Sequence, residues 1–131
     1  MSNKLDKILA EISAGELIDK IKILEIKKSK ITNKEKLIHI DKELSSLNAT
    51  RKKYIPDGSA ILKHENELKE INTKLWDIED GKRSAEKNND FGDKFIQLAR
   101  SVYKFNDKRA KIKLAINNSL GSNIKEVKSY E

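Results

Sequence analysis

Arg109 is a charged residue inside an apolar stripe, and no other residue of the chain indicates a functional or structural role as clearly. The stripe consists of Phe95, Leu98, Val102, Phe105, Ile112 and Ile116. At about 100° per residue along a helix, Arg109 projects between Val102 and Ile116 and therefore faces inward. A buried cation without a partner is very costly, so the sequence predicts either an ion-pair network or a polar pocket around this side chain.

Other polar side chains share the inward or edge positions of three predicted helices, with acidic groups on two of them and basic groups on the third. The predicted anion-binding residues are Glu25, Trp76, Glu79, Tyr103, Asn106, Arg109 and Lys113. In such a pocket Arg109 would hold a phosphate or carboxylate through its planar fork, and Lys113 would add a point charge. An aromatic ring would form a stacking wall. The favoured interpretation remains an ion-pair network that fixes the helix register.

The enzymatic alternative is a metal-dependent enzyme. Helix-borne carboxylates could hold Mg²⁺ for work on a phosphorylated metabolite or nucleotide. These carboxylates are Glu16, Asp19, Glu25, Glu79 and Asp80. Glu16 and Asp19, however, point away from the stripe that carries Glu25, and acids near a helix start are favoured by the helix dipole anyway. The two histidines lack metal-ligand spacing, so we assign no catalytic residue, metal ligand or cofactor.

The net charge of +7 raises the question of nucleic acid. Residues 1–56 carry +5, residues 57–93 carry −4 and residues 94–131 carry +6. Packed together, these segments would largely neutralise one another. Because aromatic residues are few and mostly fall on apolar stripes, we expect at most weak, non-specific nucleic-acid binding.

Local signals predict four helices in a single domain, residues 1–131. Capping boxes at Ser13–Glu16 and Thr32–Glu35 start helices over about 14–30 and 33–54. The turn 55–59, with Ser59 as a cap, precedes a helix over about 60–87. The last helix covers about 93–119 and ends at Gly121.

The second and third helices carry matching heptads, which predict an antiparallel hairpin. The positions are Leu37, Ile40, Leu44, Leu47, Arg51 and Tyr54, then Ile61, His64, Leu68, Ile71, Leu75 and Ile78. We therefore expect an all-α compact bundle in which the other two helices flank this hairpin. Residues 8–12 and 124–127 are short apolar segments that could join the termini in a two-stranded ribbon.

The first helix is apolar on two sides. Leu17, Ile21 and Leu24 form one stripe, while Ile23 and Ile26 face nearly the opposite way. Such a helix is buried on two sides, so it lies centrally or is covered by a second subunit. Ile23 and Ile26 are thus the predicted interface, and the predicted partner is another protein or a second copy.

The chain also resembles a known family. The segments that carry the resemblance are Gly15–Ile21, Ile23–Lys27, Leu75–Asp80, and the positions Phe95, Leu98–Arg100, Val102, Tyr103, Asn106, Asp107, Arg109, Ala110, Glu126 and Lys128–Tyr130. Together they are similar to an uncharacterised family of small bacterial proteins of unknown function, over about residues 8–131. The resemblance implies a mostly helical cytoplasmic protein and supplies no activity. The absence of cysteine fits a reducing compartment, and no apolar run reaches the roughly 20 residues that span a bilayer. We expect a non-enzymatic binding or assembly module.

Overall fold

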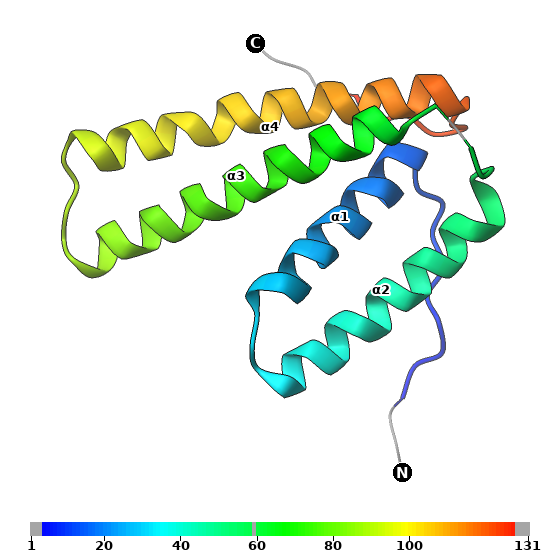
Figure 1. Ribbon diagram of the computed structural model, residues 1–131, viewed down its shortest axis with the longest axis horizontal. Coiled ribbons are helices and arrows are strands. Elements are labelled where there is room, and N and C mark those ends of the chain that lie inside the picture. Colours follow the sequence, from blue (N-terminus) through cyan, green and yellow to red (C-terminus); the bar gives the residue numbers. More distant parts are fainter. Residues whose placement is uncertain (1–3, 59, 128–131) are drawn as a thin grey trace.

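The computed structural model describes residues 4–58 and 60–127, and its four helices pack as two antiparallel hairpins (Figure 1). The helices are α1 (Ala14–Lys30), α2 (Lys34–Tyr54), α3 (Leu62–Lys87) and α4 (Asp93–Leu120). The all-α bundle is confirmed. Within the described residues, no helix combines the length and the apolar character needed to cross a membrane.

The helix ends follow local chemistry with one correction. Ser13 caps α1, because its side chain accepts a hydrogen bond from the Glu16 backbone nitrogen at 3.1 Å. The cap of α2 is Asn33 and not Thr32, since the Asn33 side chain accepts from the Lys36 nitrogen at 3.0 Å. Gly121 ends α4 in the left-handed conformation, as predicted. The predicted cap Ser59 lies outside the described residues.

The predicted hairpin between α2 and α3 is wrong. Both helices are described in full, and no Cα atom of one lies within 8 Å of the other. Instead α1 lies between them, so that α1 pairs with α2 and α3 pairs with α4 (Figure 1). The apolar heptad positions cover the central helix instead, but in α2 only Ile40 is buried, and Tyr54 is 69 % exposed. Leu44, Leu47 and Leu68 all pack in the cluster that contains Leu17 and Ile18 of α1.

The predicted ribbon between the termini is also wrong, because the described residues contain no strand. Ile8 and Leu9 are exposed, so they have no apolar surface against which a strand could pack. The two ends nevertheless meet through side chains. Asn123 Nδ2 donates to Glu11 Oε1 at 2.5 Å, and Ser122 Oγ accepts from the Ala14 nitrogen at 3.1 Å.

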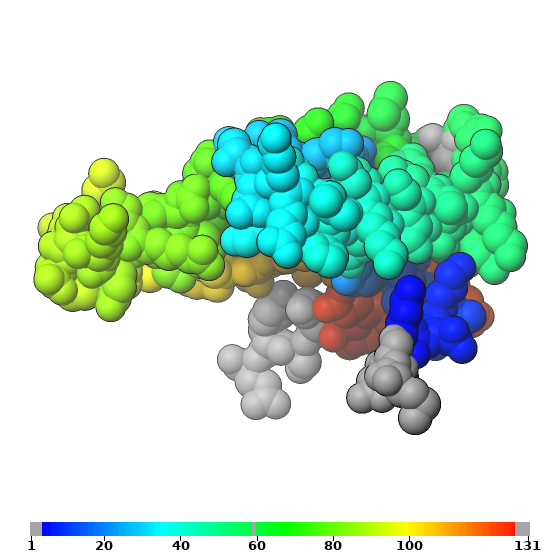
Figure 2. All heavy atoms as spheres, turned by 90° about the horizontal axis from the view of Figure 1, so that it is seen from below, coloured from blue at the N-terminus to red at the C-terminus, as the bar shows by residue number. Residues whose placement is uncertain are grey.

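The outer end of the α3–α4 hairpin extends beyond α1 and α2 (Figures 1 and 2). We call residues 76–104, which include this end, the arm. Within the arm only Ile78 is buried. The inner part of the same hairpin, by contrast, holds Leu68, Ile112 and Ile116 in the core. The arm is therefore two helices thick and lacks the cover that α1 gives to the rest.

Candidate functional site

Arg109 binds a carboxylate that sequence reasoning set aside, that of Asp19. Asp19 is fully buried at 0 % exposure, and its Oδ1 accepts from Arg109 Nε and from Asn72 Nδ2, both at 2.9 Å. Arg109 Nη2 donates to the second oxygen, Oδ2. The hydrogen bond that Arg109 donates to Asp19 raises the pKa of Arg109 and outweighs burial, which would lower that pKa. One carboxylate thus ties α1, α3 and α4 together.

A signal for Asp19 was present in the second apolar stripe of α1. Residues at spacings of three, four and seven share a helix face, so the stripe of Ile23 and Ile26 extends back to Asp19 and Glu16. The acidic first turn is also what a helix dipole favours. Because the helix dipole already explained an acidic residue at this position, sequence reasoning did not predict that Asp19 is buried.

Lys113 continues the network one turn along α4. Its Nζ lies 2.6 Å from Glu16 Oε2, 2.9 Å from Glu126 Oε2 and 4.0 Å from Asp19 Oδ2. Burial alone would lower the pKa of Lys113, but the hydrogen bonds to Glu16 and Glu126 outweigh this effect and raise it. Three carboxylates therefore surround two cations, and the charges on Arg109 and Lys113 are already matched inside the chain.

The start of α1 lies directly against α4. The Gly15 nitrogen donates to Asn117 Oδ1 at 2.6 Å, which satisfies an N–H group that has no partner within its own helix. A Cβ atom on Gly15 would lie 2.4 Å from the backbone oxygen of Lys113. Glycine is required here because the two helices approach too closely for any side chain.

Beside this network, a groove of about 330 Å³ lies between α1, α3 and α4. Its apolar lining consists of Ile23, Ile26, Leu75, Trp76 and Val102. Its polar lining consists of Asn72, Glu79, Asp80, Arg83, Asn106 and Arg109. Arg109 Nη1 reaches Asn106 Oδ1 at 3.5 Å, on the groove side of the ion pair. Trp76, the only tryptophan of the chain, is half-buried.

The groove gathers four of the seven residues predicted to bind an anion: Trp76, Glu79, Asn106 and Arg109. The other three are not among its lining residues. Glu25 pairs with Lys22 at 3.0 Å, Tyr103 is exposed, and Lys113 lies in the ion-pair network. The geometry favours the network, and anion binding stays a prediction.

The two residues predicted to form an interface differ in exposure. Ile26 is 4 % exposed and is covered by the chain's own fold. Ile23 is half-buried and faces the groove. Only Ile23 of the pair therefore presents substantial surface to a partner.

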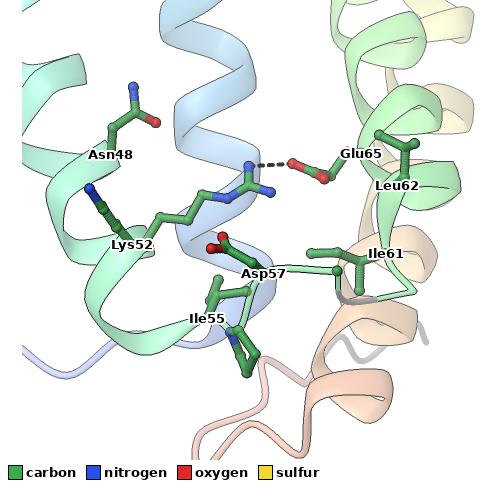
Figure 3. Close-up of a pocket in the computed structure, with 10 residues that line it drawn as sticks. Asn48, Lys52, Ile55, Asp57, Ile61, Leu62 and Glu65 are labelled. Carbon is green, nitrogen blue, oxygen red and sulfur yellow. Dashed lines mark hydrogen bonds and ion pairs between the residues drawn. The ribbon is translucent and has the colours of Figure 1, made fainter.

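A second buried carboxylate, Glu65, lies in the first turn of α3. It binds Arg51, and Lys22 Nζ lies 3.7 Å from it. Figure 3 shows the adjoining cavity of about 400 Å³, with Asn48 and Lys52 on one side, Ile61, Leu62 and Glu65 on the other, and Asp57 at the turn. Arg51 at a heptad core position was the sequence signal for this pair.

The carboxylates proposed for Mg²⁺ do not gather. Among the described residues, no three acidic, histidine or cysteine side chains lie where they could hold a metal ion. Glu16 and Asp19 instead bind Lys113 and Arg109. The geometry therefore gives no support to the Mg²⁺ enzyme alternative.

Comparison with known proteins places the chain without assigning it an activity. Neither the curated proteins nor the solved structures include a match to it. A family model matches residues 8–131, which is nearly the whole chain. The chain therefore belongs to a family of unknown function (DUF6165).

Proposed function

We propose that this protein is a non-catalytic binding module, and that the groove between α1, α3 and α4 receives a segment of a second protein chain. The observation that carries the proposal is Trp76, a half-buried indole beside Arg109 in an open, partly apolar groove. Tryptophan and arginine are the residue types most enriched where protein interfaces gain their binding energy.

The composition of the groove supports a protein segment more than a small anion. Arg109 is fixed by Asp19, and its charge is matched. It can still donate hydrogen bonds through Nη1 to a carbonyl or an amide oxygen. The lining of the groove has no excess positive charge that would attract an anion. The rim carries both signs, with Glu79 and Asp80 beside Arg83. An apolar centre with a mixed polar rim is the usual anatomy of a protein interface.

The same lining argues against catalysis at this groove. It contains no histidine, serine or cysteine, the side chains that most often act as nucleophiles or general bases. Its two acids, Glu79 and Asp80, are neighbours on α3, so they cannot stand on opposite sides of a substrate.

A photoreactive phenylalanine analogue at Asn106 tests the proposal in cells of the native host. Asn106 is exposed and lines the groove, whereas Lys104 on the same helix is exposed and does not line it, which makes position 104 the control. We expect a discrete adduct from position 106 that is absent from position 104. It should disappear when Trp76→Ala is added to a chain that stays folded. Equal adducts at both positions, or none at either, would overturn the proposal.

Inorganic phosphate and sugar phosphates test the anion alternative on the purified protein. A ligand at 100 times its dissociation constant stabilises a fold by about 2.7 kcal/mol. Under the proposed function, none of these anions raises the unfolding temperature in a way that depends on Arg109. If an anion raises the unfolding temperature of the wild type and not that of a folded Arg109→Met variant, the groove binds a small anion instead.

A further inference from the structure

We propose that the segment received by the groove is the arm of a second copy of this chain, so that two arms pair antiparallel about a two-fold axis. This inference rests on the proposed function and names its partner. Two helices that expose apolar side chains along one face become a four-helix bundle when they pair with an identical hairpin. The arm needs such cover, since Ile78 is its only buried residue.

The register follows from unpaired charges on the groove. Asp80 and Arg83 both line it, both are exposed, and neither forms an ion pair with any residue that the structure describes. An axis that crosses α3 between residues 81 and 82 brings Asp80 of one copy opposite Arg83 of the other. Symmetry then forms the same pair a second time.

The same axis also matches the aromatic residues. Gly81 lies against Leu98, so these two residues mark one level of the hairpin. At 1.5 Å per residue, Trp76 lies about 8 Å from the axis toward the bundle. The first residue of α4, Asp93, lies about 8 Å from the axis toward the tip, and Phe91 precedes it by two residues. A two-fold rotation therefore brings Phe91 of one copy to the level of Trp76 of the other. Phe91 is 50 % exposed, and its ring packs edge-on against Phe95, with centroids 5.4 Å apart.

Charge reversal tests this arrangement without touching the core. In a two-fold pair, Asp80→Arg faces Arg83 of the second copy, and Arg83→Asp faces Asp80. We expect each single variant to weaken the dimer by about tenfold or more, because like charges meet twice. The double variant restores opposite charges and should return to within about threefold of the wild type. Asp77→Arg is the matched control, since Asp77 is exposed on the same helix and does not line the groove.

Analytical ultracentrifugation over a concentration series measures the dimer, and circular dichroism checks the fold of each variant. Trp76 gives an independent signal, because its emission should shift to the blue as concentration rises in the wild type and not in either single variant. A wild type that stays monomeric up to its solubility limit would overturn the inference. A dimer that responds to Asp77→Arg as strongly as to Asp80→Arg would overturn it too.

The two proposals fail in different ways. A monomeric protein whose position 106 still forms a discrete adduct with a different protein would refute the second copy and leave the binding module standing. An adduct of twice the chain's mass, lost in Asp80→Arg and recovered in the double variant, supports both.

Discussion

Replacing Arg109 with methionine should lower the free energy of unfolding more than any other single change to a groove residue. Methionine removes the guanidinium that donates from Nε and Nη2 to Asp19. The carboxylate of Asp19 stays at 0 % exposure, with Asn72 at 2.9 Å and Lys113 at 4.0 Å as its remaining partners. Breaking one side of a buried ion pair costs about 3–5 kcal/mol because it leaves a buried charge uncompensated.

The reverse change, Asp19→Asn, should cost less. It leaves the Arg109 guanidinium without its carboxylate, but that side chain is 27 % exposed and can still reach water. We expect a loss of about 1.5–3 kcal/mol, the range for hydrogen bonds to a charged group. The double variant should cost less than the sum of the two single changes, since the interaction that both remove is counted once.

Urea denaturation followed by circular dichroism gives the free energy of unfolding for all four proteins. The control is Arg100→Met on the same helix, where an exposed arginine has no ion pair with the described residues, and the change should stay within about 0.5 kcal/mol. An Arg109→Met loss below about 1 kcal/mol would refute the reasoning. So would strict additivity of the two single variants.

Further single substitutions test other contacts of the fold. Gly15→Ala should cost about 2–3 kcal/mol, because its Cβ would lie 2.4 Å from a backbone oxygen. Gly81→Ala meets only the flexible end of a leucine at 3.0 Å and should leave the melting temperature unchanged or higher; equal losses at both glycines would contradict the close approach. The raised pKa of Lys113 means that its contribution is complete below about pH 10.5 and is lost as pH rises through the folded-state value. The stability gap between the wild type and Lys113→Met should therefore narrow above that pH in a urea series. Asn33→Ala should cost about 1 kcal/mol as the loss of a helix cap, and a neutral result in thermal unfolding would remove Asn33 from that role.

The helices were predictable because the signals that start and stop them are local. Ser13 and Gly121 act within one turn of their own positions, as their sequence context indicates. Which stripes face each other depends on segments far apart in the sequence. Two apolar heptads joined by a short turn are equally compatible with direct pairing and with a third helix between them. The two-sided α1 is what occupies that space here.

Of the two partners in the ion pair, only Arg109 was predictable from the sequence. The inward direction of Arg109 follows from its place among apolar neighbours, and the structure places it against a buried carboxylate. The identity of that carboxylate does not follow from composition, since Glu25, Glu79 and Asp19 are all plausible partners by charge. Packing of α1 against α4 through Gly15 selects Asp19, and this close approach is visible only in three dimensions.

The same anchoring explains why a groove exists at all. At 1.5 Å per residue, the 17 residues of α1 extend about 25 Å, whereas the 28 residues of α4 extend about 42 Å. The contact between Gly15 and Asn117 fixes the start of α1 near the end of α4, so the shorter helix ends well before the tip of the arm. The apolar faces of α3 and α4 continue past that point, and Trp76 and Val102 lie where the cover from α1 stops. The ion pair of Asp19 and Arg109 is a second contact that fixes the position of α1 along α4. The charged residues that first suggested a ligand pocket therefore fix α1 at a position that leaves an apolar surface uncovered beside them.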